Sequence, residues 1–223
     1  MTGPPRRVPW VVGVTGASGV PYAAAVIRGL LDAGEPVDLV VSQAARLTML
    51  DELGFAVRDR AWREDVESWL GRGVGDMAYW SAGDMAAGPS SGSYRTQGMV
   101  VVPATSAAVA GIALGTSKDL LQRAADVTLK ERRTLVLVVR EMPLRTPVLE
   151  HMASLSREGA VLMPASPAFY SGARDVQQLV DFVAGRVLDS CGVEHDLYLR
   201  WSGTLGAALQ QPSAPLGAED DRS

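Results

Sequence analysis

The chain has 223 residues, enough to bury one hydrophobic core, so a single domain is the expected organisation. Its formal net charge of −4 gives no reason to expect nucleic acid or an anionic membrane surface as a partner. A single cysteine, Cys191, excludes a disulfide within the chain and suits a reducing compartment, so we expect a cytoplasmic protein. No uninterrupted apolar run approaches the length of a membrane-spanning helix.

Short apolar runs rich in β-branched residues alternate with helical patterns along the chain. The apolar runs predict five strands, over 10–14, 37–41, 98–102, 134–139 and 160–163. The helical patterns predict six helices, over 21–33, 43–53, 105–113, 117–132, 147–157 and 174–191. Alternation of this kind is typical of a three-layer α/β fold, in which helices cover both faces of a mostly parallel sheet.

The first predicted strand runs into a loop of small residues, TGASG at 15–19, and a predicted helix follows at once. Such a junction often holds a phosphate, because backbone N–H groups and the helix dipole face the anion. The spacing Gly13-x-x-Gly16-x-x-Gly19 differs from the dinucleotide motif G-x-G-x-x-G, and the second strand ends in Ser42 rather than an acid. NAD enzymes are therefore disfavoured, as are P-loop NTPases, while a mononucleotide such as FMN remains compatible.

Two stretches fall outside the strand–helix alternation. Residues 55–97 combine a charged, tryptophan-bearing segment with a Gly/Ser-rich stretch, and we expect either an ordinary surface excursion or a lid. Residues 206–223 are polar, acidic and contain proline, so we expect a disordered tail after a single domain over 1–205.

The predicted strands end in small or polar residues, and ligands of open parallel sheets bind outside the carboxyl ends of the strands. Arg140 and Glu141 directly follow the buried-type strand 134–139, which favours a functional role for both. The sequence pattern alone decides nothing about three other polar residues, Glu52, Tyr170 and Arg186.

The helix predicted over 117–132 carries two cations on one face, since Arg123 and Lys130 are seven residues apart. Their spacing by itself favours ordinary surface ion pairs, between Asp119 and Arg123 and between Asp126 and Lys130.

Metal chemistry finds little support in the sequence. The two histidines, His151 and His195, and Cys191 show no metal-ligand spacing, and no aspartate-rich motif for Mg²⁺ and prenyl diphosphates is present. A substrate phosphate would then have to be neutralised by arginine and lysine.

Over residues 10–201 the chain resembles the UbiX family of flavin prenyltransferases. The resemblance is carried, in order and spacing, by GVTGASG, VVSQAARLTMLDE, SSGS, RAADVTLKERR with LVLVVREMPL, GAVLMPASPAFY, and DFVAGRVLD with a later RW. It implies a Rossmann-like flavoprotein fold and a homo-dodecamer with sites at subunit interfaces.

The resemblance also implies an activity. The family joins a dimethylallyl group, from dimethylallyl phosphate or in some members the diphosphate, to reduced FMN at N5 and then at C6. The product, prenylated FMN, serves decarboxylases of the UbiD type, and no metal takes part.

The family's functional residues match positions of this sequence. The matches for flavin binding are Gly16, Ala17, Ser18, Ser42, Thr105, Ser106, Ala107, Ala108 and Arg140. The matches for the substrate phosphate are Arg123, Lys130, Tyr170 and Arg186, which replaces the surface-pair interpretation of the helix over 117–132. The matches for catalysis are Ser18, Glu52, Lys130, Glu141 and Trp201, with Ser18 and Glu141 relaying a proton and Trp201 covering the prenyl group.

Three positions depart from the family pattern. Ala104 and Thr105 stand where the family often has cysteine and serine, and Gln43 stands where it often has lysine. A flavin-dependent cysteine decarboxylase is disfavoured because PATSAAVAG lacks the expected asparagine and no histidine follows a predicted strand. A non-catalytic carrier of prenylated FMN would not need Glu52, Lys130 and the other matched charges. The sequence leaves open the choice between monophosphate and diphosphate, and the decarboxylase that is served.

Overall fold

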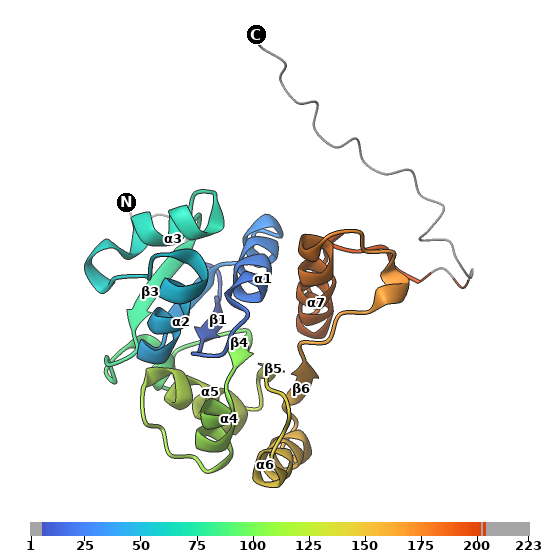
Figure 1. Cartoon of the computed structure of the whole chain (residues 1–223). Coiled ribbons are helices and arrows are strands. Elements are labelled where there is room, and N and C mark those ends of the chain that lie inside the picture. Colours follow the sequence, from blue (N-terminus) through green and yellow to red (C-terminus); the bar gives the residue numbers. More distant parts are fainter. Residues whose placement is uncertain (1–5, 202, 204–223) are drawn as a thin grey trace.

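A six-stranded sheet forms the centre of the computed structural model, which describes residues 6–201 and 203 (Figure 1). The strands lie in the order β3-β2-β1-β4-β5-β6, and every neighbouring pair is parallel. Their bounds are β1 (Trp10–Val14), β2 (Val37–Val41), β3 (Met77–Ser81), β4 (Gly98–Ala104), β5 (Thr134–Val139) and β6 (Val161–Pro164). The predicted tail at 206–223 lies outside the described residues.

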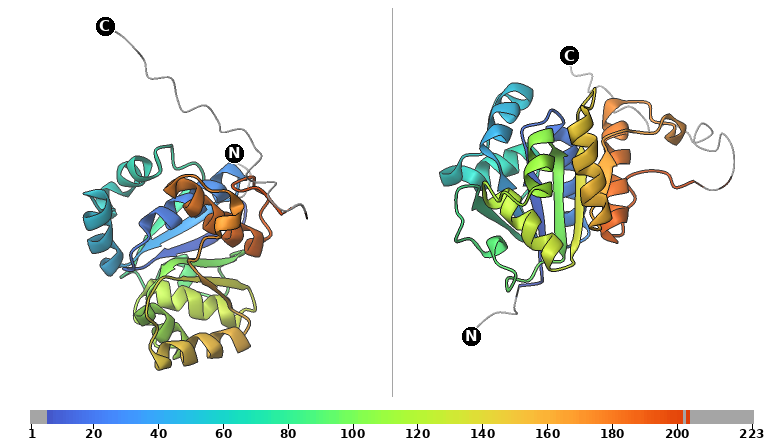
Figure 2. Two further views of the ribbon diagram at one scale, coloured as in Figure 1. Left: turned by 45° about the vertical axis from the view of Figure 1, so that its right-hand side comes forward. Right: turned by 90° about the horizontal axis from the view of Figure 1, so that it is seen from below.

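Seven α-helices cover the sheet within the described part of the chain: α1 (Val20–Asp32), α2 (Gln43–Leu53), α3 (Trp62–Leu70), α4 (Ser106–Ala113), α5 (Leu120–Lys130), α6 (Thr146–Arg157) and α7 (Val176–Cys191). Helices α1, α2, α3 and α7 lie on one face, and α4, α5 and α6 lie on the other (Figures 1 and 2).

The strand residues alternate between the two helical layers. In β1, Val12 and Val14 pack toward the layer of α1 and α7, whereas Val11 packs toward α4 and α5. All residues of β1, β2 and β4 are buried, as expected for parallel strands covered on both sides. The predicted three-layer fold is confirmed. An α-helix connects most consecutive strands, whereas β3 and β4 are joined by a segment without an α-helix, and the sheet is parallel throughout.

The five predicted strands and six predicted helices are present with small shifts at their ends, but β3 and α3 were missed. Both lie in the segment 55–97. Strand β3 is at the sheet edge and has one fully buried residue, Met77, so its sequence, MAYWS, lacks the apolar run that identified the other strands.

The last part of that segment is tied to α5 and to the loop between α5 and β5. The Arg133 guanidinium donates hydrogen bonds to the carbonyl oxygens of Gly92 (2.8 Å) and Tyr94 (2.9 Å), and Arg123 Nε donates to Ser90 O (3.1 Å). These contacts fit a fixed surface excursion better than a free lid. Among the residues that the structure describes, no helix is long and apolar enough to cross a membrane.

A fully buried carboxylate, Asp38 in β2, joins three parts of the chain. It accepts hydrogen bonds from Arg6 Nη1 and from the Tyr94 hydroxyl, each at 2.7 Å. Burial, followed by the hydrogen bond to Asp38, raises the pKa of Tyr94 to about 12, so this hydroxyl remains a donor at neutral pH. The pair fixes the segment before β4 against the second strand.

We expect Tyr94→Phe to lower the free energy of unfolding by about 1.5–3 kcal/mol, because it removes a hydrogen bond to a charged, buried acceptor. Urea unfolding at a fixed protein concentration measures this loss. Tyr22→Phe is the matched control, since the Tyr22 hydroxyl has no hydrogen-bond partner among the described residues. Equal losses in both variants would contradict the role of the Asp38–Tyr94 bond.

Candidate functional site

A cavity of about 730 Å³ opens at the carboxyl ends of β1 to β4, the sheet edge at which the sequence predicts the ligand site. Its wall comes from the loop after β1, the first turns of α2 and α4, the loop after β3 and the start of α5. Five of the predicted flavin-binding residues line it: Gly16, Ser42, Thr105, Ala107 and Ala108.

Three helices present their N-termini to this cavity: the Asp119 carboxylate caps α5, whereas hydroxyl groups cap α2 and α4. Ser42 Oγ caps α2 by accepting from Ala45 N (3.1 Å), and Thr105 Oγ1 caps α4 by accepting from Ala108 N (3.0 Å). Neither first turn contains an acidic residue. Each cap satisfies one of the four N–H groups that lack a partner within the helix, and the positive ends of both dipoles remain available to an anion. The arrangement suits a phosphate group.

The loop after β1 is held close to these two helices. The buried Thr15 hydroxyl donates to Pro103 O (2.6 Å) and accepts from Thr105 N (2.9 Å). At Gly16, a Cβ atom would lie 2.7 Å from the Cβ of Ala44, so only glycine allows the loop to approach α2 this closely. Thr15 was not among the predicted site residues, although a hydroxyl at the end of a buried strand was the available signal.

The N-terminus of α1 differs from the prediction. The Glu52 carboxylate accepts from Gly19 N (3.0 Å) and Val20 N (3.0 Å), so the first amides of α1 are already bound by a residue of α2. These two amides are therefore not free to bind a phosphate, and the structure does not support the expectation for α1. The N-termini of α2 and α4 keep unpaired amides at the cavity, and Glu52 holds the loop after β1 in place.

Ser18, Ser106, Arg140 and Glu141 meet at the same edge of the sheet. Arg140 Nε donates to Ser18 O (3.0 Å), and Ser106 Oγ donates to Glu141 Oε2 (3.4 Å). Ala17 belongs to the same loop as Ser18 and is buried. One chain thus brings all the predicted flavin-binding residues, together with Glu52 and Glu141, to the carboxyl ends of the strands.

The predicted phosphate-binding cations on α5 make different ion pairs from those that their spacing suggested. Arg123 Nη1 pairs with Asp126 Oδ2 (2.7 Å), not with Asp119, whose carboxylate caps α5. Lys130 Nζ pairs with Glu131 Oε1 (2.5 Å), not with Asp126. Both surface pairs named from the sequence are wrong, because the cap and the helix end supply nearer partners.

Lys130 lies far from the cavity in its own chain. It is the last residue of α5, and β5 begins only four residues later, which puts Lys130 toward the amino edge of the sheet. The cavity is at the opposite, carboxyl edge.

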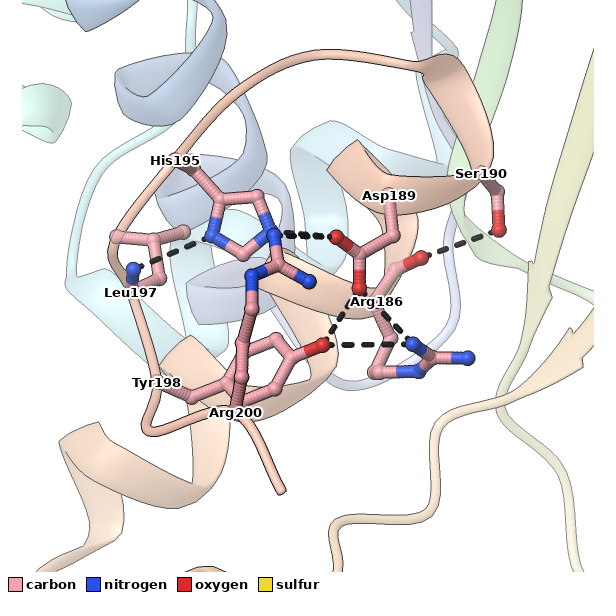
Figure 3. Close-up of polar contacts among 7 residues, drawn as sticks. All are labelled: Arg186, Asp189, Ser190, His195, Leu197, Tyr198 and Arg200. Carbon is pink, nitrogen blue, oxygen red and sulfur yellow. Dashed lines mark hydrogen bonds and ion pairs between the residues drawn. The ribbon is translucent and has the colours of Figure 1, made fainter. Parts of the chain in front are cut away.

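Arg186 belongs to α7, which lies across the sheet from α5 (Figure 1), and Tyr170 packs against Phe182 of α7. Tyr170 and Trp201 form an edge-to-face pair with ring centroids 6.3 Å apart, and they are 67% and 59% exposed. Arg186 Nη1 donates to Asp189 Oδ2 (2.9 Å) and to the Tyr198 hydroxyl (3.3 Å), as Figure 3 shows. One chain therefore does not unite the residues predicted to bind the substrate phosphate.

Further polar residues of the cavity wall were missed by the sequence analysis. Lys118 lines the cavity, and its ammonium makes no ion pair within the described residues. Arg46 lines it too and bonds to Asp59 and to the Tyr79 hydroxyl (2.7 Å). Burial raises the pKa of Asp59, but hydrogen bonds from Tyr79 and Arg46 outweigh it, so that pKa lies below its ordinary value. Asp59 and Tyr79 belong to the unpredicted segment, which explains the omission.

Potential metal ligands do not gather anywhere in the described part of the chain: no group of three or more His, Cys, Asp or Glu side chains is placed to hold an ion. His195, one of the two histidines, instead contacts Asp189 (3.0 Å) near the end of α7.

Comparisons with known proteins identify the family of the chain and agree with its fold. The flavoprotein family model matches residues 3–188. A flavin prenyltransferase UbiX of Streptomyces coelicolor is 62% identical over 212 residues, covering 90% of this chain and 98% of the relative. The crystal structure of AnUbiX (PadA1) in complex with FMN and dimethylallyl pyrophosphate matches with a TM-score of 0.79 at 37% identity, covering 89% of this chain and 100% of that one.

A dodecameric FMN-dependent UbiX-like decarboxylase from Escherichia coli O157:H7 matches with a TM-score of 0.78 at 40% identity, over 88% of this chain and 100% of that one. Similarity at this level extends over nearly the whole length of each relative. The chain belongs to the flavoprotein family and, within it, to the UbiX family of flavin prenyltransferases.

Proposed function

We propose that this chain transfers a dimethylallyl group from a dimethylallyl phosphate to reduced FMN. Family membership supports the reaction class. The observation that carries the proposal for this chain is the cavity at the carboxyl edge, where two capped helix N-termini without acidic first turns meet a loop of small residues.

The residues present fit FMN. Ser42, Thr105 and the unpaired amides of α2 and α4 would hold its phosphate, since hydroxyls and helix N-termini are ordinary phosphate ligands. Residues 16–18 and Arg140 would hold the ring system, because Arg140 is already joined to this loop through Ser18. When bound, the reduced flavin supplies the nucleophilic atoms of the reaction, for which we propose N5 and then C6.

The substrate phosphate requires cations. Breaking the allylic C–O bond leaves negative charge on the departing phosphate and positive charge on the prenyl group. Arg123, Lys130 and Arg186 would stabilise the phosphate, while the faces of Trp201 and Tyr170 would shield the prenyl cation. These residues lie on opposite sides of one sheet, so we propose that they meet between subunits of a homo-oligomer. The dodecameric relative from Escherichia coli supports a dodecamer.

Two carboxylates, those of Glu141 and Glu52, would support proton transfer at the flavin. Glu141 shares a hydrogen bond with Ser106 and lies at the edge that also holds Ser18, so Ser18 and Glu141 would relay a proton at the flavin. Glu52 would keep the loop after β1 in the conformation that the relay needs. We further propose that the reaction needs no metal and that the prenylated FMN passes to a decarboxylase of the UbiD type.

The reaction is tested by incubating the protein anaerobically with reduced FMN and dimethylallyl monophosphate, with and without EDTA, and measuring the flavin mass. We expect the mass gain of one prenyl unit in both cases. A flavin of unchanged mass, whichever dimethylallyl phosphate is supplied, would favour the carrier alternative. Release of CO₂ from a peptidyl cysteine would favour the decarboxylase alternative, whose histidine base has no counterpart in the cavity wall described here. Strict dependence on Mg²⁺ would contradict the metal-free reaction.

We expect Lys118→Gln to weaken FMN binding about tenfold while leaving riboflavin binding unchanged, because it removes a cation from the wall of the cavity in which we propose that the phosphate binds. Quenching of flavin fluorescence measures both affinities. Arg95→Gln is the control, since it removes the same charge from an exposed position outside the cavity wall. Equal losses for FMN and riboflavin would contradict contact between Lys118 and the phosphate.

Lys130→Ala and Glu131→Ala separate two roles of the α5 cation. Both variants break the same exposed ion pair, which contributes little to stability. Only Lys130→Ala removes the ammonium that we propose for the phosphate, and we expect it to lower kcat/KM for dimethylallyl monophosphate about ten- to a hundredfold. Glu131→Ala should retain near wild-type kcat/KM, and both should keep their FMN affinity. Matching kinetics in the two variants would remove Lys130 from the site.

A further inference from the structure

The carboxylate of Asp189, near the end of α7, gathers donors from four side chains (Figure 3). Its Oδ2 accepts from Arg186 Nη1 (2.9 Å) and the Tyr198 hydroxyl (2.5 Å), and its Oδ1 accepts from Arg200 Nη2 (2.8 Å) and His195 Nε2 (3.0 Å). Only Arg186 belongs to α7 itself. The other three donors come from the segment that follows the helix, which we term the return segment (193–201).

The hydrogen bond that His195 Nδ1 accepts assigns the roles of the two ring nitrogens. Leu197 N donates to His195 Nδ1 (3.2 Å), so the proton of the neutral imidazole is assigned to Nε2, the atom that faces Asp189. Burial acts to raise the pKa of Asp189, but hydrogen bonds from Arg200, Tyr198 and His195 outweigh it and lower that pKa to about 2. The carboxylate is therefore ionised at neutral pH, and each of its oxygens serves two donors.

The return segment packs closely along α7. The Phe182 and Tyr198 rings have centroids 4.9 Å apart. A Cβ atom at Gly185 would lie 2.5 Å from the Tyr198 ring and 2.7 Å from the His195 ring, so this glycine makes the approach possible. Trp201 follows Arg200 directly and reaches Tyr170 on the preceding loop.

The Arg186 guanidinium has N–H donors that this cluster does not use. Its contacts with Asp189 and Tyr198 both use Nη1, and none of its recorded hydrogen bonds in the described structure uses Nε or Nη2. A guanidinium carries five N–H donors in a fixed plane, so an anchored Nη1 determines where the remaining edge points. Half of the Arg186 side chain is exposed, with 53% of its surface accessible.

We propose that Asp189 is a positioning residue for the dimethylallyl phosphate site: it fastens the return segment to α7, orients Arg186 toward the phosphate and sets Trp201 beside Tyr170. The proposal rests on the proposed function, in which Arg186 and Trp201 contact the substrate. Asp189 itself lies behind Arg186 and would touch neither the substrate nor the flavin.

The test uses Asp189→Asn in the protein loaded with oxidised FMN, to which dimethylallyl monophosphate binds without turnover. The asparagine keeps the shape of the side chain but loses the charge and one acceptor oxygen. We expect the Kd for dimethylallyl monophosphate, measured by calorimetry, to rise about tenfold while the Kd for FMN stays unchanged. Trypsin should also cleave after Arg200 faster, because the return segment opens more often.

Asp181→Asn is the matched control. It makes the same substitution on the same helix, where the Asp181 carboxylate accepts one hydrogen bond from the described residues, donated by Gln177 (2.8 Å). We expect it to bind both ligands and resist trypsin like the wild type. Tyr198→Phe removes a single donor from Asp189, and we expect smaller changes in the same directions, which keeps the test valid if Asp189→Asn folds poorly.

Three results would overturn the proposal. Unchanged trypsin cleavage in Asp189→Asn would show that the carboxylate does not fasten the return segment. Faster cleavage with an unchanged Kd for dimethylallyl monophosphate would show fastening without positioning. Equal weakening of FMN and dimethylallyl monophosphate would show a general structural role. A wild-type protein that binds FMN but no dimethylallyl monophosphate would instead overturn the proposed function. The two failures can be distinguished, because trypsin cleavage reports on the return segment whether or not the substrate binds.

Discussion

A parallel sheet covered on both faces separates the two groups of cations on which the proposed chemistry depends. Arg123 and Lys130 belong to α5 on one face, and Arg186 belongs to α7 on the other. A helix cannot leave its face without exposing the apolar side chains that pack there, such as Leu121 of α5 or Val187 of α7. The two groups can therefore act on one phosphate only if different copies of the chain supply them.

The flavin half of the site obeys a different constraint. Four helices begin at the carboxyl edge near the cavity. The Glu52 carboxylate occupies the N-terminus of α1, and the Asp119 carboxylate caps α5. The N-termini of α2 and α4 are capped by the hydroxyls of Ser42 and Thr105, which leave other amides unpaired. This difference leaves amides free at α2 and α4 but not at the start of α1. Thr15 fixes the loop after β1 to the start of α4, so the residues that we propose for the flavin keep their relative positions within one chain.

Much of the fold could be predicted from the sequence, because β1, β2, β4 and β5 are apolar runs that need burial on both faces. Strand β3 could not, since an edge strand with half-exposed aromatic residues shows no such run. The gathering of Ser18, Arg140 and Glu141 followed from the rule that parallel strands end at one edge. The partners of Arg123 and Lys130 did not follow from spacing, because Asp119 was used as a helix cap and Glu131 lay at the helix end. The role of Trp201 came from the family resemblance. In our proposal it depends on contact between subunits, so the position of Trp201 in one chain could not identify it.

The central claim is that the substrate phosphate is held by cations from different subunits. Mixed oligomers of Lys130→Ala and Arg186→Ala chains, each with little activity alone, test it most directly. If one site takes Lys130 from one subunit and Arg186 from another, about a quarter of the sites in an equal mixture carry both native residues, and prenyl transfer returns to about a quarter of the wild-type rate. If both residues of a site come from the same chain, no mixed oligomer contains an intact site, and an absence of recovered activity in verified mixed oligomers would contradict the account.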